Sequence, residues 1–368
     1  MSSKFGYADS QSLFSVPREW QLLLPAWISF AVVTVLVGGL RLAGISIPMS
    51  IQLLAYLIGL VAINLPHGGF ENLQNLRTRS ARFQAIYAVV FVAMVAGFIG
   101  LLLWNAVIGV ALMIAVACVK GGFGGLAVLD AVTGTDHIQS RFQRWLGAGV
   151  RGGAVMLVPY VAFTETFEQY TAYMVDVFDP GALAAATWAF HPITYNYAVP
   201  AAILLGVIAH IGLGYARDPG TRTWLADAIE TILLVVYFSV VPVVLAVGLY
   251  FPLWYSARQV ARSAAVDDER PVEEGAWMSE EYRSEHVASL LNWSMFIVGG
   301  VFTGLLLAAL WYFAPEPIME VAAADYASDT TALLAGGVVF YTIFVSIIAL
   351  PHVVVGGFID RQGIWFIP

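Results

Sequence analysis

The stretch LADAIETILLVVYFSVVPVVLAVGLYFPLWYSA, residues 225–257, decides how many times this chain crosses a membrane. It is mostly apolar and contains two prolines, Pro242 and Pro252. One straight helix of this length would be about 50 Å long, whereas the hydrocarbon core of a bilayer is about 30 Å thick. We therefore predict a helical hairpin that is broken at Pro242. Its arms of about 24 Å are tolerated where they are buried in protein or line a cavity.

The composition of the whole chain is that of a membrane protein. Apolar residues make up 60% of the 368 residues, charged residues only 11%, and the mean hydropathy is +0.79. A soluble domain usually has about 25% charged residues. We predict an all-α fold, a polytopic bundle of about ten (eight to ten) transmembrane helices, since each crossing takes about 20 apolar residues. The predicted spans lie near residues 20–40, 48–64, 83–103, 106–128, 147–164, 196–215, 225–240, 243–257, 290–313 and 331–357.

The arginines in the loops predict the orientation of these spans, because cytoplasmic loops carry an excess of Lys and Arg. If residues 225–257 cross and return, every basic loop except the one with Arg41 falls on one side. The loops 166–195 and 314–330, which have no Lys or Arg, fall on the other side. We predict a single transmembrane domain, residues 1–368, in the cell membrane with both termini cytoplasmic. The acidic stretch 263–287 is then a cytoplasmic loop.

Charge and cysteine content narrow the setting further. The formal net charge is −8, and the basic residues include only two lysines, Lys4 and Lys120. An acidic, lysine-poor exterior is typical of salt-adapted proteins, because salt screens the self-repulsion, and it favours a halophilic host. No basic patch for nucleic acid is present. Cys118 is the single cysteine, so no disulfide can form within the chain.

Ionisable residues inside spans are costly and are therefore functional candidates. The predicted topology places several ionisable residues, together with the polar residues Tyr255 and Gln259, in the cytoplasmic half of the membrane. Each also has a structural interpretation, such as a capped turn, an interfacial histidine, a carboxylate at a helix N-terminus or a lysine that reaches the headgroups. Glu165 and His191 fall near the opposite surface, and we expect His137 and His286 to be solvated in polar loops. The cytoplasmic set is His67, Lys120, His210, Glu230, His352, and Tyr255 with Gln259 one helical turn apart.

Four segments of the chain carry a family resemblance. They are LPHGGFENL (65–73), VRGGAVMLVPYVAFTETF (150–167), DAIETILLVVYFSVVPVVLAVGLYFPLWYSARQVAR (227–262) and LPHVVVGGFIDRQGIW (350–365). Their order and spacing resemble the Brp/Blh family, membrane enzymes that cleave β-carotene into two retinals, and the haloarchaeal members in particular. The resemblance extends from about residue 60 to the C-terminus.

The resemblance implies an iron site of four histidines, from which this chain departs. His67 stands in the LPHG turn that supplies one ligand in the family. Gly122, in CVKGGFGGLAVL, takes the place of the second histidine. Tyr255 and Gln259, in WYSARQ, take the places of a histidine pair at i and i+4. Glycine has no donor atom, and neutral Tyr and Gln are poor ligands for the iron that activates dioxygen.

This departure leads to the functional prediction. We predict a non-cleaving relative that binds a carotenoid or retinal, or assists a rhodopsin, and that needs no cofactor. The aromatic residues Tyr250, Phe251 and Trp254 would line the tunnel for such a polyene. Lys120 is a further candidate, because a buried lysine can form a Schiff base with retinal.

Two alternatives stay open, and the sequence does not decide whether the chain is an enzyme. An active β-carotene dioxygenase would need Fe(II) in a relocated site, with His67, His210, Glu230 and His352 as the candidates. A structural subunit of a membrane complex would have stable protein partners and no pigment. Membrane lipids are partners in every case.

Overall fold

The computed structural model describes residues 18–60, 76, 79–259, 262, 301, 305, 308–309, 312, 321–322 and 325–361. The elements that these residues form are all helices, which confirms the all-α prediction. They are α1 (Arg18–Gln21), α2 (Leu24–Leu42), α3 (Met49–Leu57), α5 (Ala81–Trp104), α6 (Ala106–Val132), α7 (Arg141–Ala162), α8 (Thr164–Asp176), η2 (Ala182–Ala186), η3 (Thr194–Ala198), α9 (Val199–Arg217), α10 (Arg222–Val240), α11 (Val243–Tyr250), η4 (Phe251–Ser256) and α14 (Asp329–Arg361).

Four of the long helices begin at side-chain caps. Ser80, Asn105, Ser140 and Thr221 each accept a hydrogen bond from the backbone N–H three residues later, at the starts of α5, α6, α7 and α10. Such caps satisfy backbone donors that have no partner within the helix. They therefore fix the residue at which each of these helices begins.

Seven helices in the described part of the chain are long and apolar enough to cross a membrane, so the protein is a multi-pass membrane protein. They correspond to seven of the predicted spans, from Leu24–Leu42 to Asp329–Pro351. The predicted span 48–64 appears as the shorter helix Met49–Leu60, beyond which the chain is not described. The predicted span 290–313 and the acidic loop 263–287 lie outside the described residues, apart from a few single positions in the former.

The hairpin predicted at 225–257 is confirmed. Val241 and Pro242 are extended, because Pro lacks the N–H that would continue α10. Ring contacts and a hydrogen bond then join the two arms, with Tyr237 Oη donating to the Ala246 carbonyl at 3.0 Å. Further from the turn, Arg258 Nη2 donates to Glu230 Oε2 at 2.7 Å. The chain therefore returns along α11 and η4 to the level at which α10 began.

Arg41 lies at the same end of the bundle as the hairpin turn at Val241 and Pro242. Its guanidinium donates to the Val240 carbonyl at 2.9 Å and lies 5.1 Å from the ring centroid of Phe163. The hairpin turn, the end of α2 and the start of α8 therefore meet at one end. Glu165 and His191, which the sequence places near this surface, are both exposed.

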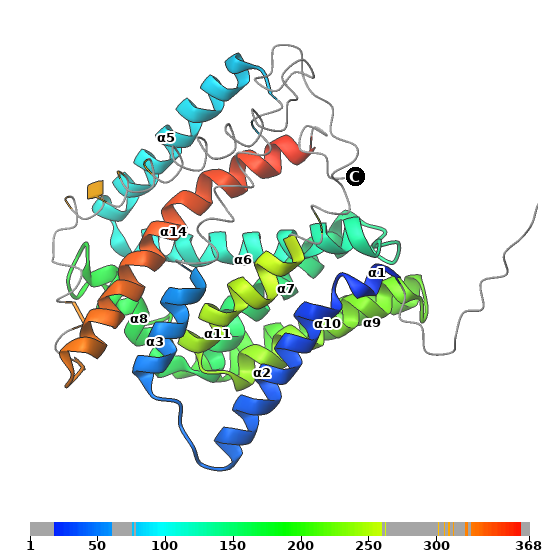
Figure 1. Ribbon diagram of the computed structural model, residues 1–368, viewed down its shortest axis with the longest axis horizontal. Coiled ribbons are helices and arrows are strands. Elements are labelled where there is room, and N and C mark those ends of the chain that lie inside the picture. The colour runs from blue at the N-terminus through cyan, green and yellow to red at the C-terminus, as the bar shows by residue number, and fades with distance from the viewer. Residues whose placement is uncertain are drawn as a thin grey trace, which may run out of the picture.

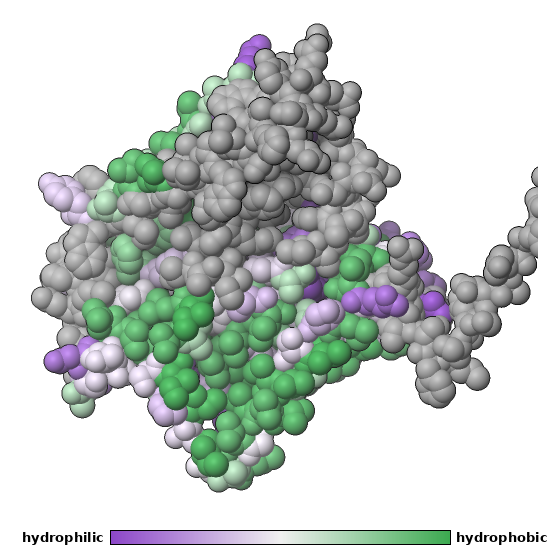
Figure 2. Space-filling view, in the orientation of Figure 1, coloured by the Kyte–Doolittle hydropathy of each residue, from purple (hydrophilic) through white to green (hydrophobic). Residues whose placement is uncertain are grey.

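The helices at the centre of the molecule pack closely against one another. Figure 1 shows α6 running through the middle of the bundle, with α14 between α5 and α6. A Cβ on Gly152 of α7 would lie 2.0 Å from the Cys118 carbonyl oxygen of α6, so the two backbones touch here. Small residues allow such contacts between membrane helices. The outward sides of the helices are apolar, and Figure 2 shows this over α2 and α3.

Candidate functional site

The second hairpin arm consists of α11, η4 and the helical turn that follows them, up to Gln259. Tyr255 and Gln259 lie at the end of this arm and face α6. Tyr255 belongs to η4 and Gln259 to the helical turn that follows, and they are 8% and 4% exposed. A Cβ placed on Gly124 of α6 would lie 3.5 Å from the Tyr255 ring and 3.6 Å from Gln259 Nε2. The part of α6 that meets this pair is therefore a glycine, which offers no donor atom.

Gly122 faces α7 instead of this pair. A Cβ on Gly122 would lie 2.1 Å from the Ala148 carbonyl oxygen, closer than real side chains approach. Residues two apart on a helix point to nearly opposite sides. The structure thus brings Gly124, and not Gly122, to Tyr255 and Gln259. A histidine at position 122 would require α7 to move away from α6.

An apolar cavity lies beside Tyr255, between α6, α7, the second hairpin arm and α14. Its free volume is about 60 Å³ and part of it is open to the surroundings, so it admits the end of an apolar ligand rather than the whole of one. Lys120, Tyr250 and Phe251 line it together with Tyr255. Lys120 Nζ lies 5.2 Å from the centroid of the Tyr255 ring. Trp254 lies outside this cavity and packs on Phe30, with 4.6 Å between ring centroids.

A buried ionic network holds the second hairpin arm against α7 and α10. Arg151 of α7 donates to Asp227 Oδ1 at 2.5 Å and to Glu230 Oε2 at 2.9 Å. Arg258 donates to the same Glu230 oxygen at 2.7 Å, and Trp27 Nε1 donates to Oε1 at 2.9 Å. Two guanidinium groups and two carboxylates thus balance one another in charge, as buried ions require.

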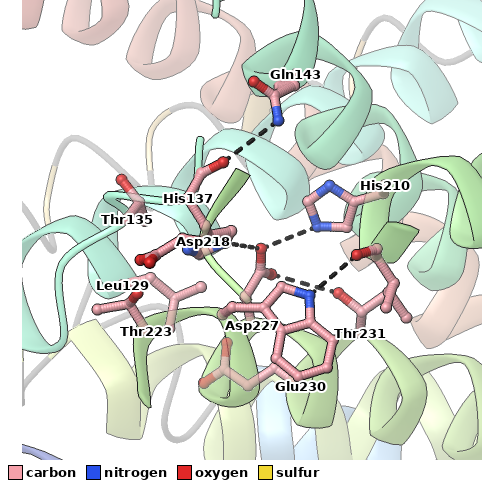
Figure 3. A network of polar contacts seen from close by, with 12 residues as sticks. Leu129, Thr135, His137, Gln143, His210, Asp218, Thr223, Asp227, Glu230 and Thr231 are labelled. Atoms are coloured by element: carbon pink, nitrogen blue, oxygen red, sulfur yellow. Dashed lines mark hydrogen bonds and ion pairs between the residues drawn. The ribbon is translucent and has the colours of Figure 1, made fainter. Parts of the chain in front are cut away.

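Two histidines complete this network, as Figure 3 shows. His137 Nε2 lies 2.8 Å and His210 Nε2 lies 3.0 Å from Asp227 Oδ2. His137 is only 1% exposed, so the prediction that it is solvated is wrong. We expected solvation because His137 lies in a polar loop, but this loop folds back onto α10 and buries the side chain. His210 is buried as well, and its partner is a carboxylate rather than the membrane interface.

Sequence reasoning missed three members of this network, Arg151, Asp227 and Arg258. A signal for them exists in the sequence. Asp227 and Glu230 are three residues apart and so share a helix face. Arg151 lies within an apolar span, where a charge needs a partner of opposite sign. Pairing these charges between spans would have favoured the contact between α7 and α10.

The described side chains do not fit an iron site. Among them no group of three His, Cys, Asp or Glu residues is placed to hold a metal ion. His210 contacts Asp227, and Glu230 pairs with two guanidinium groups, so neither has its donor atoms directed at a common point. His67 lies outside the described residues, and His352 lies in α14 with its side chain outside the description.

Comparisons with known proteins point to one family. Residues 58–360 match the family described as beta-carotene 15,15'-dioxygenase. The chain is 47% identical over 335 residues to the probable beta-carotene 15,15'-dioxygenase Brp of Halobacterium salinarum, an alignment that covers 89% of each chain. It is 28% identical over 332 residues to the probable beta-carotene 15,15'-dioxygenase Blh of the same species, over 88% of this chain and 89% of Blh. No solved structure matches the chain.

Proposed function

The chain belongs to the beta-carotene 15,15'-dioxygenase family, and from this premise we propose that it binds a carotenoid or retinal without cleaving the carotenoid. The binding site is the apolar cavity beside Tyr255, between α6, α7, the second hairpin arm and α14. Aromatic walls suit a conjugated polyene, because flat rings and a long apolar chain bury surface against each other. Tyr250 and Phe251 supply such walls here.

One observation carries the non-cleaving part of the proposal. Where α6 meets the second hairpin arm, the facing residues are Gly124, Tyr255 and Gln259. This set offers a phenol and an amide, and it lies beside the cationic Lys120. A cation disfavours the binding of Fe(II) nearby, and iron chemistry with dioxygen needs imidazole or carboxylate ligands.

The test is binding and cleavage measured on one preparation. The protein, purified in detergent, is titrated with β-carotene and with all-trans-retinal, and quenching of tryptophan fluorescence reports binding. Fe(II) and dioxygen are then supplied, and retinal is quantified by chromatography. We expect saturable binding of the polyene and no retinal above a protein-free control. Retinal formed in proportion to the protein would overturn the non-cleaving proposal, and absent binding would overturn the role as a whole.

An active dioxygenase is the second candidate, because both relatives are named probable beta-carotene 15,15'-dioxygenases. It would use Fe(II) bound by residues that include His67. Metal analysis of the protein from its native membrane separates the two candidates. Iron that is bound in stoichiometric amount, and that is lost in His67→Ala, would favour the dioxygenase. A protein that carries pigment but no iron would favour the binding role.

The proposed role includes a place and a partner. The protein lies in the cell membrane with both termini in the cytoplasm, and it passes retinal to a rhodopsin or another membrane protein. The Arg-rich loops support this orientation. Its test uses Cys118→Ala as background, with single cysteines introduced before α2 and in the loop 166–195. A membrane-impermeant maleimide applied to whole cells should label only the second position, and labelling of the first would reverse the orientation.

A further inference from the structure

Lys120 lines the apolar cavity, in which the other described lining residues are apolar or uncharged. It extends from the middle of α6 toward the second hairpin arm, where its Nζ lies over the Tyr255 ring at 5.2 Å. The sequence has only one other lysine, Lys4, which lies outside the described residues. The cavity therefore combines a primary amine, an aromatic face and room for the end of an apolar ligand.

We propose that Lys120 forms an imine with an aldehyde-bearing polyene such as retinal, which makes the cavity a covalent site. This inference rests on the proposed polyene-binding function and names the ligand's reactive group. The ammonium of Lys120 first passes a proton to water, and the neutral Nζ attacks the aldehyde carbon. A C=N bond forms, and the aldehyde oxygen leaves as water with the two remaining amine hydrogens. No oxidant, reductant or metal takes part in this step. Proteins form Schiff bases with lysines whose amines lie in apolar sites.

The Tyr255 ring supports both states of the nitrogen. A ring face attracts a cation within about 6 Å of its centroid. The ammonium of Lys120 meets this condition at 5.2 Å, and a protonated imine at the same nitrogen is also a cation. Tyr255 is thus a positioning residue for Lys120, which gives a role to a residue that is a poor metal ligand. Its ring, and not its hydroxyl, is what this role requires.

The experiment traps the imine by reduction. The full chain in detergent is incubated with all-trans-retinal and reduced with borohydride, and the peptides are identified by mass spectrometry. We expect one retinyl group per chain on the peptide with Lys120, and none on the peptide with Lys4. Lys120→Arg should abolish the label while keeping the charge, and Lys4→Arg should label like the unaltered protein. Equal labelling of both lysines would overturn the proposal.

Two further measurements separate this proposal from the proposed function. β-carotene has no aldehyde, so it should bind to the unaltered protein and leave no label on Lys120 after reduction. If retinal and β-carotene both bind but no label forms, the imine is refuted and the binding role stands. If neither polyene binds, both fail together. Tyr255→Phe should retain the label and Tyr255→Leu should lose most of it, and equal labelling of the two variants would refute the role of the ring.

Discussion

Glu230→Gln is the sharpest test of the buried ionic network. Glu230 is fully buried, and its carboxylate accepts hydrogen bonds from Arg151, Arg258 and Trp27. Glutamine has nearly the same shape but no charge. The substitution therefore leaves two guanidinium groups opposed by Asp227 alone, with little change in packing.

The expected magnitude follows from the distances. At an effective dielectric constant of about 20, opposite charges 2.7–2.9 Å apart attract by about 6 kcal/mol for each pair. The cost of burying the charges offsets much of this, and removal of one partner from a buried pair costs about 3–5 kcal/mol. In the variant, Arg151 retains its ion pair with Asp227, whereas Arg258 retains a hydrogen bond of 3.4 Å to the Gly125 carbonyl. We expect a loss of about 3 kcal/mol, at the lower end of this range.

The assay is unfolding in dodecyl maltoside micelles titrated with SDS, followed by helical circular dichroism. Glu165→Gln is the matched control, because Glu165 is an exposed carboxylate on α8, and its change should stay within about 0.5 kcal/mol. The double variant Glu230→Leu with Arg258→Leu removes both partners and should be milder than Glu230→Leu alone. A loss below about 1 kcal/mol in Glu230→Gln, or a double variant worse than the single one, would refute the reasoning.

Gly152→Ala should destabilise the protein by about 1–3 kcal/mol in the SDS assay, because its Cβ would meet the Cys118 carbonyl oxygen at 2.0 Å. Gly149→Ala on the same helix meets nothing within 4 Å and should stabilise by up to about 1 kcal/mol, so equal effects would contradict the packing of α7 on α6. Ala117→Trp should fill the cavity and weaken β-carotene binding at least about tenfold in the fluorescence titration, and unchanged affinity would locate the polyene elsewhere. Trp27→Phe removes the N–H that Glu230 accepts and should cost about 1–3 kcal/mol, less so when Glu230 is already Gln.

The sequence alone identified the seven long membrane-spanning helices that the structure describes and the break in the hairpin. Both depend on local properties of the chain, namely the length of an apolar run and the missing N–H of Pro242. The loop arginines were enough to predict that residues 225–257 cross and return. The contacts of Arg41 with Val240 and of Arg258 with Glu230 confirm that hairpin.

From the sequence we predicted that Lys120, Tyr250, Phe251 and Trp254 bind the ligand, and the first three line the cavity together with Tyr255, whereas Trp254 does not. The family resemblance implies that Gly122 stands where a ligand histidine would be, whereas the α6 residue that faces Tyr255 and Gln259 in the structure is Gly124. An offset of two residues turns the contact to the other side of a helix. Only the rotation of α6 against α7, which their backbone contacts set, decides which glycine faces the site.

What only the tertiary structure decided is which buried charges meet. Arg151, Asp227, Glu230 and Arg258 come from three separate helical segments, and His137 joins them from a loop. The sequence determined that so apolar a chain must lie in a membrane and that charges within it need partners. Hydropathy and Pro placement act along the chain, whereas ion pairing and cavities arise from the relative rotation and approach of helices. Those depend on packing among segments that are distant in sequence.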